Sequence, residues 1–138
     1  MNKTVFILFA LLFVACVLGA QQSQEPANPT AGPKVSTGDS QKQNPVKPTP
    51  ESLAKGKKTY AIDCAMCHGE NGDGKGELAG DLKNVTDFTA PEALKNRTDG
   101  ELFAVMRKGK GEMPPEGDRA KNEDIWNLVN YIRSLKKK

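Results

Sequence analysis

The chain has 138 residues and allows one small domain, because 27% of the residues are charged and only 6% are aromatic. Its 20 basic and 17 acidic side chains leave a net charge of +3, which is too mild for a nucleic-acid-binding protein with a strongly basic face. Three cysteines and a single histidine exclude clusters that need many metal-binding side chains.

Residues 1–20 are predicted to be a secretory signal peptide. Lys3 supplies a short positive region, residues 5–18 form an unbroken apolar run, and two small residues follow at 19 and 20. Two alternatives stay open. The stretch before Cys16 resembles the box of a bacterial lipoprotein, which predicts lipidation of Cys16. The run could also be kept as an uncleaved anchor, although it is shorter than the roughly 20 residues that a bilayer span prefers.

Residues 21–50 are predicted to be a flexible linker. The segment has no aromatic residue and holds six of the nine prolines, namely Pro26, Pro29, Pro33, Pro45, Pro48 and Pro50. Such a composition cannot offset its ordering entropy by apolar burial, so the chain should stay extended or disordered. A linker of this kind suits a domain tethered to a membrane as well as an ordinary flexible tail, and both interpretations stay open.

Residues 51–138 are predicted to form a single all-α domain, because no alternating apolar and polar run indicates a strand. Residues 49–51 supply a cap and a first-turn proline for one helix, and residues 98–101 form a capping box for another. Asn122 is expected to cap a last helix, and a shorter helix is expected over 91–96. Apolar residues recur at helical spacing in the last helix: Ile125, Leu128, Val129 and Ile132.

Two cysteines and the only histidine stand together in the stretch Cys64-Ala65-Met66-Cys67-His68. Cysteines three positions apart project from one helical turn, so their sulfurs can bond to the two vinyl groups of a single haem. The adjacent histidine can then ligate the iron. The motif therefore predicts one covalent haem c with His68 as the proximal iron ligand, and the absence of a second histidine from the sequence excludes bis-histidine ligation.

Three other uses of this motif stay open. A redox disulfide between Cys64 and Cys67 would need a βαβ context, and a structural zinc site would need a fourth ligand. A structural disulfide across two residues is strained and leaves His68 without a role. The surroundings are helical and glycine-rich, which favours haem.

The sixth iron ligand is expected to be Met113. Met66 is pinned between the two cysteines, and Met106 lies on the apolar face of a predicted helix, where a place in the core is expected. Met113 lies in a loop shaped by glycines and prolines over 109–115, from which a thioether can approach the iron opposite His68. The alternative is that Met113 is a loop contact beside an open iron site.

The domain resembles the class I cytochromes c over nearly all of 51–138. The resemblance lies in three motifs: Gly56-x-x-x-Tyr60-x-x-x-Cys64-x-x-Cys67-His68-Gly69, Gly111-x-Met113-Pro114 and Ile125-x-x-Leu128-Val129-x-Tyr131-Ile132. It implies three to five helices wrapped around one haem, with the first and last helices crossing where Gly56 lets Tyr131 approach. The family often has a proline near residues 78–82, where a carbonyl accepts a hydrogen bond from the proximal histidine. This chain lacks that proline, so the acceptor for His68 is not identified.

The resemblance implies a monohaem electron carrier rather than an enzyme, since iron held by His68 and Met113 has no free coordination position. Its partners are expected to be membrane oxidoreductases or a terminal oxidase that dock weakly, and the domain is expected to be a monomer in the bacterial periplasm, with an N-terminal tether as an option. The alternatives are a haem enzyme of peroxidase type or a gas-binding protein with an open distal site, and the haem subunit of a larger dehydrogenase.

Three cations, Arg107, Lys108 and Lys110, precede the Met113 loop and are expected near the rim of the haem. They form either a docking patch for an acidic redox partner or a solvated run of charges, whose field the nearby acidic residues dilute.

Overall fold

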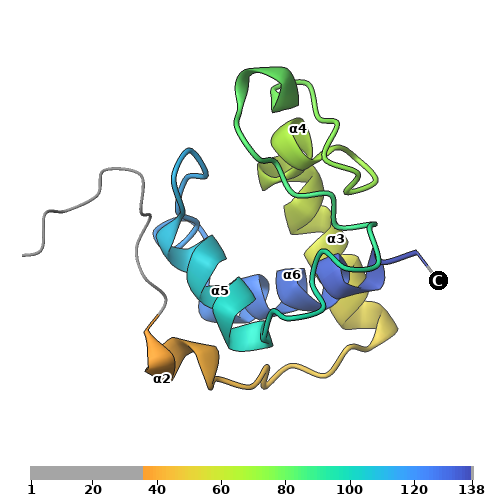
Figure 1. Ribbon diagram of the computed structural model, residues 1–138. Helices are drawn as coiled ribbons and strands as arrows, with labels where there is room; N and C mark the ends of the chain where they lie inside the picture. Colours follow the sequence, from red (N-terminus) through yellow and green to blue (C-terminus); the bar gives the residue numbers. More distant parts are fainter. Residues whose placement is uncertain (1–35, 138) are drawn as a thin grey trace, which may run out of the picture.

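The computed structural model describes residues 36–137, so the predicted signal peptide and the first part of the predicted linker lie outside the described residues. In chain order the elements are α2 (Thr37–Ser40), α3 (Pro50–Asp63), α4 (Ala65–His68), the short 3-10 helix η1 (Ala79–Asp81), α5 (Asp99–Lys108) and α6 (Asn122–Ser134) (Figure 1). Over this range the chain is helical, with one isolated bridge between Lys110 and Met113. The all-α prediction is confirmed.

Two of the helices begin at the caps that the sequence predicts. The Thr49 side chain accepts a hydrogen bond from the amide of Ser52 at 3.2 Å, and Pro50 takes the first helical position of α3. At the start of α5 the Thr98 hydroxyl accepts from the Glu101 amide, while the Glu101 carboxylate accepts from the Thr98 amide. Each cap satisfies amides that have no partner within the helix.

Two local predictions differ from the structure. Asn122 is the first residue of α6 rather than its cap, and its side-chain oxygen accepts a hydrogen bond from Arg107 at 2.8 Å. Residues 91–96 form consecutive turns rather than a helix. The carbonyl oxygen of Leu94 accepts hydrogen bonds from the Arg97 amide at 3.2 Å and from the Arg133 guanidinium of α6 at 3.1 Å, so these turns are attached to α6.

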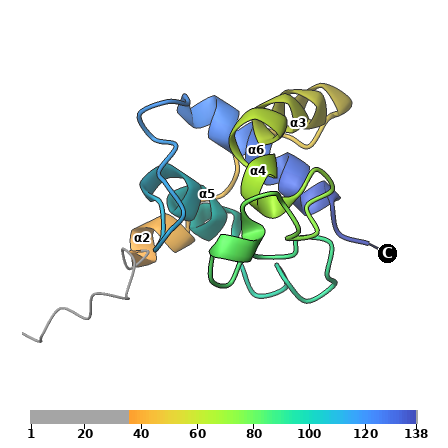
Figure 2. The ribbon, with the colours of Figure 1, turned by 90° about the horizontal axis from the view of Figure 1, so that it is seen from above.

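Helices α3 and α6 cross (Figures 1 and 2), and the buried residues of the core gather around this crossing. A Cβ added to Gly56 would lie 2.7 Å from the Cβ of Tyr131 and 2.8 Å from the carbonyl carbon of Asn127. Only glycine allows two helices to approach this closely. The crossing implied by the family resemblance is therefore confirmed, and it also brings the rings of Tyr60 and Tyr131 to a centroid distance of 5.3 Å.

Helix α5 packs beside α6 through an aromatic contact. The rings of Phe103 and Trp126 stack with centroids 4.1 Å apart and both side chains are buried. Met106 is also in this core, which confirms its expected place. None of the helices in the described range is long and apolar enough to span a bilayer.

The predicted linker over 21–50 has to be shortened, because residues 36–49, here called the 36–49 arm, are packed against the domain. The arm begins with α2, which lies beside α5 in Figures 1 and 2. Farther along, the Asn44 side chain bonds to Asn130 and to the Trp126 carbonyl oxygen, both on α6. Composition suggested disorder because the arm has few apolar residues, but polar contacts hold it in place.

Candidate functional site

The turn that carries Cys64, Cys67 and His68 begins where α3 ends. Cys64 caps α3 at its C-terminal end and directly precedes α4. The amide of Cys67 donates to the Cys64 carbonyl oxygen at 3.2 Å, and the amide of His68 donates to the same oxygen at 2.9 Å. The structure therefore brings the two predicted cysteines and the predicted histidine together on one helical turn.

The His68 imidazole is held from two sides. Its Nδ1 lies 3.1 Å from the carbonyl oxygen of Thr86, and its ring stacks on Phe88 with a centroid distance of 4.5 Å. A carbonyl oxygen can only accept, so Nδ1 carries the proton and Nε2 keeps its lone pair. Burial lowers the pKa of His68, and the hydrogen bond to Thr86 partly opposes this effect. A neutral ring with a free Nε2 is the form that binds a metal.

Thr86 is the acceptor that the sequence did not identify. The structure brings it to the motif because the amide of Phe88 donates to the carbonyl oxygen of Gly72 at 2.7 Å. The buried Tyr60 stabilises the turn after His68, because its hydroxyl donates to the Gly69 carbonyl oxygen at 2.8 Å. A backbone carbonyl can come from any residue type, so no side-chain pattern could have indicated Thr86.

No disulfide bond joins Cys64 and Cys67. Burial raises the pKa of the Cys64 thiol to about 12, whereas redox-active dithiols depend on a lowered pKa that supplies a thiolate. A zinc site needs four converging ligands, and residues 36–137 contain no group of three or more His, Cys, Asp or Glu side chains placed to hold a metal ion. The local chemistry fits neither the redox-disulfide nor the zinc alternative.

Met113 lies on a tight turn that follows α5. Gly109, with φ of +73°, ends the helix, and Lys110 and Met113 then exchange two backbone hydrogen bonds of 3.0 Å. The neighbouring Glu112 carboxylate accepts from the amide of Lys83 at 2.9 Å. Met113 itself is half-buried against the core. This turn is thus attached to the segment that follows the cysteine motif.

Charged groups attach the segment after Met113 to the end of α3. The Glu116 side chain is buried and pairs with Arg119, whose guanidinium also lies 3.8 Å from the carboxylate of Asp63. Asp63 directly precedes Cys64. Among the described residues the second carboxylate oxygen of Glu116 is buried without a hydrogen-bond partner. Arg119 therefore connects the two segments that carry the predicted ligands, a role that sequence reasoning missed because Arg119 resembles any surface cation.

The other methionines of the domain are placed less suitably than Met113 for ligating the iron. Met106 is 4% exposed within the apolar core, and Met66 is 56% exposed on α4 between the two cysteines. Met113 stays the candidate for the distal ligand.

Two of the three cations expected near the haem rim bond within the chain. The Lys108 ammonium lies 2.5 Å from the Asp39 carboxylate, and the Arg107 guanidinium donates to Asn122 at 2.8 Å. The charge of Lys108 is therefore compensated by Asp39, whereas Arg107 is bonded to a neutral amide and keeps its charge for the docking-patch interpretation.

The donor set fits a covalent haem c. Two thiols on one turn can form the two thioether bonds. The His68 imidazole keeps Nε2 free for the iron, because Nδ1 is hydrogen-bonded to the Thr86 carbonyl oxygen. The exposed apolar side chains of Met66 and Leu78, 56% and 40% exposed, lie on and after this turn. Cys64, Cys67, His68 and Met113 are the residues that would hold the group.

An all-helical domain that presents Cys-x-x-Cys-His on one turn and a thioether on a separate loop is that of a class I cytochrome c, which carries covalently bound haem c. The chain belongs to the family described as cytochrome c oxidase, cbb3-type, subunit III, whose model matches residues 51–132.

Individual relatives agree with this family. The chain is 35% identical over 82 residues to the cbb3-type cytochrome c oxidase subunit FixP of Azorhizobium caulinodans, covering 59% of this chain and 26% of that protein. It is 34% identical over 88 residues to cytochrome c6 of Cladophora glomerata, covering 59% of this chain and 87% of that protein. Among solved structures, the KustC0563 c-type cytochrome superposes with a TM-score of 0.55 at 26% identity and covers 59% of this chain and 98% of its own. The similarity to FixP thus spans about a quarter of that subunit.

Proposed function

We propose that the chain is a monohaem c-type cytochrome that carries single electrons between extracytoplasmic or membrane redox partners. The observation that best supports this proposal is the hydrogen bond from His68 Nδ1 to the Thr86 carbonyl oxygen, which leaves Nε2 for the iron. A loop that carries Met113 and is attached to the haem-motif side through Glu112 and Lys83 supports a second axial ligand.

In this proposal Cys64 and Cys67 would hold the haem covalently, and His68 and Met113 would supply the two protein ligands of the iron. The bound group supplies an iron that cycles between Fe(III) and Fe(II). A neutral thioether and an imidazole as iron ligands would stabilise Fe(II) and raise the potential, and the buried position of Cys64 would keep water away from one thioether bond. With both positions filled, no coordination site is left for a substrate, so the protein is proposed not to be an enzyme.

The redox partners are proposed to be membrane oxidoreductases or a terminal oxidase, and the match to a cbb3-type oxidase subunit supports the latter. The apolar run over 5–18 supports export to the bacterial periplasm, with an N-terminal tether or lipidation at Cys16 as further options. The protein is proposed to act as a monomer that docks weakly.

A second candidate is a haem subunit of a larger assembly. It is favoured by the match to FixP, in which the region similar to this chain makes up 26% of the subunit. Purification from native membranes under mild conditions separates the two candidates, because a mobile carrier elutes alone, whereas a subunit elutes with the other chains of its complex.

The experiment that tests the ligation is absorption spectroscopy of the haem-loaded full chain and of Met113→Ala. The wild type should show a low-spin spectrum with the iron–thioether charge-transfer band, and Met113→Ala should become high-spin. Met66→Ala is the matched control, because its side chain is exposed between the cysteines and its removal should leave the spectrum unchanged. A high-spin wild-type ferric spectrum, or rapid binding of carbon monoxide by the ferrous form, would contradict the carrier and favour the open-site alternative.

A further inference from the structure

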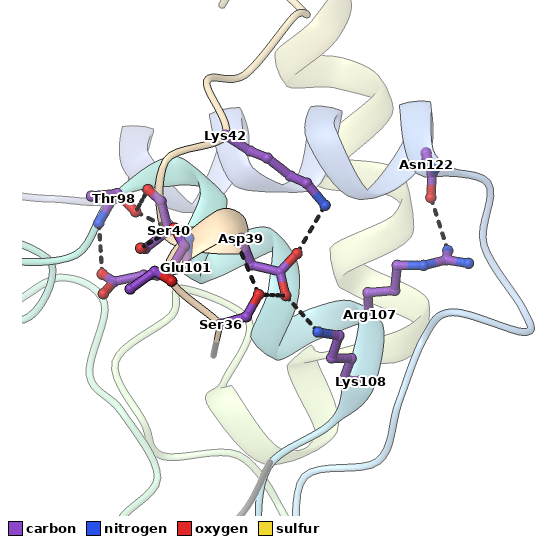
Figure 3. A network of polar contacts seen from close by, with 10 residues as sticks. Ser36, Asp39, Ser40, Lys42, Thr98, Glu101, Arg107, Lys108 and Asn122 are labelled. Carbon is purple, nitrogen blue, oxygen red and sulfur yellow. Dashed lines mark hydrogen bonds and ion pairs between the residues drawn. The ribbon is translucent and has the colours of Figure 1, made fainter. Parts of the chain in front are cut away.

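The 36–49 arm lies outside the family match, which begins at residue 51, and it packs against α5. Asp39 of α2 is buried, and its carboxylate accepts from Lys108 at 2.5 Å, from Lys42 at 2.8 Å and from the Ser36 hydroxyl at 3.0 Å (Figure 3). Lys108 is the last residue of α5. The arm is therefore bonded to the C-terminal residue of α5, next to the loop that follows this helix.

The start of α5 is shaped to receive the same arm. The Thr98 hydroxyl donates to the Ser40 carbonyl oxygen at 2.8 Å (Figure 3). A Cβ added to Gly100 would lie 2.7 Å from the carbonyl oxygen of Lys42 and 3.0 Å from its amide nitrogen. The backbone of the arm thus touches the backbone of α5 at a position where only glycine leaves room. Both ends of α5 are fixed by one segment.

A second anchor fixes the arm to α6. The Asn44 amide donates to the Asn130 side-chain oxygen at 2.8 Å, and the Asn130 amide donates back to the Val46 carbonyl oxygen at 3.0 Å and to the Ser52 hydroxyl at 2.9 Å. Asn130 is buried on α6. Because α6 crosses α3 at the core, the arm is attached to the rigid part of the domain and can transmit that rigidity to α5.

The Met113 turn follows directly from the end of α5. Gly109 caps the helix, and the turn closed by the Lys110–Met113 hydrogen bonds follows at once. Since Met113 is five residues beyond Lys108, a movement of this helix end moves the turn with it.

We propose that the 36–49 arm is a clamp that positions the Met113 loop, with Asp39 and Lys108 as positioning residues that hold the end of α5. The clamp slows the opening of the loop and so slows the replacement of the Met113 thioether by a competing ligand. This inference rests on the proposed ligation of iron by Met113.

The test uses the haem-loaded full chain and follows the displacement of Met113 by imidazole at saturating concentration, where the observed rate reports loop opening. Loss of the iron–thioether charge-transfer band is the signal. Asp39→Asn and Lys108→Met should each raise the rate about two- to fivefold, as expected for one partly exposed ion pair. The double variant should be no faster than the faster single variant, because both substitutions remove the same contact.

Gly100→Ala provides a variant that changes no charge. Alanine favours the helix itself, so any increase in rate has to come from the collision with the arm. Glu92→Gln is the matched control, because it removes the exposed Glu92–Lys95 pair, which is separate from α5, and it should leave the rate unchanged.

Unchanged displacement rates in Asp39→Asn and Gly100→Ala would overturn the clamp. A lowered melting temperature without a change in rate would also overturn it, because the arm would then only add stability. Failure of the proposed ligation gives a different result: Met113→Ala would then keep the wild-type spectrum, and the inference would fall with it.

Discussion

The imidazole Nδ1 of His68 and the carbonyl oxygen of Thr86 lie 3.1 Å apart, although 18 positions separate the two residues. This hydrogen bond sets the tautomer of the ring and directs Nε2 away from the backbone. It takes the place of the carbonyl near residues 78–82 that the resemblance led us to consider.

Because Thr86 acts through its backbone, Thr86→Ala should keep the hydrogen bond. We expect its unfolding free energy to stay within about 0.5 kcal/mol of the wild type and its spectrum to be unchanged. Phe88→Ala removes the ring stacked on His68 and should destabilise the half-buried site by about 1–3 kcal/mol. Urea denaturation followed by haem absorption measures both, and equal stabilities for the two variants would contradict the role of Phe88.

The crossing of α3 and α6 predicts that replacing Gly56 by a larger residue strongly lowers the stability of the protein. Gly56→Ala places a methyl group against Tyr131 and the Asn127 backbone, so the helices must separate, at a cost of about 1–3 kcal/mol or more. Gly80→Ala is the control, because a Cβ there meets nothing within 4 Å. Circular dichroism during thermal unfolding should show a lower melting temperature for Gly56→Ala alone.

The ion pair of Arg119 and Glu116 predicts an asymmetry between two variants. Arg119→Met leaves the buried Glu116 carboxylate without its cation and should cost about 1–3 kcal/mol, less than for a fully buried pair because Arg119 is half-exposed. Adding Glu116→Gln removes the charge and should recover part of the loss. Lys95→Met, which breaks an exposed pair, should cost almost nothing. If the double variant proved less stable than Arg119→Met, the buried charge would not be the cause.

The hydrogen bonds of Asp39 in the arm predict that the stability of the protein falls at acid pH. Hydrogen bonds from Lys108, Lys42 and Ser36 hold the pKa of Asp39 well below its usual range. A carboxyl whose pKa is depressed on folding contributes stability above its unfolded pKa of about 3.9 and loses it as the pH falls toward the folded value. The stability difference between wild type and Asp39→Asn should therefore be constant near neutral pH and shrink below about pH 4. Urea midpoints from pH 7 to pH 3 measure it, and a difference that persists unchanged at pH 3 would contradict this assignment.

The sequence predicted the features that local chemistry decides. A capping box at Thr98, a first-turn proline at Pro50 and a Cys-x-x-Cys-His turn depend on residues within a few positions of one another, so their patterns are visible in the chain. The acceptor for His68 and the pairing of Asp39 with Lys108 were not predictable, because the first is a backbone carbonyl and Lys108 is separated from Asp39 by 69 positions. Helix α6 begins one residue earlier than predicted, and the Asn122 side chain accepts a hydrogen bond from Arg107 rather than capping the helix.

The buried side chain of Asn130 on α6 indicates where the cooperative folding unit of the protein begins. On one side of residue 51, Asn130 accepts a hydrogen bond from Asn44 and donates one to the Val46 carbonyl oxygen, and on the other side it donates to Ser52. The border of the family match therefore does not divide the molecule into independent parts. Amides that report global unfolding by hydrogen exchange should extend from α6 across that border to Val46. A protein cut at residue 51 would keep every proposed haem ligand and would still leave the polar edge of α6 open to solvent.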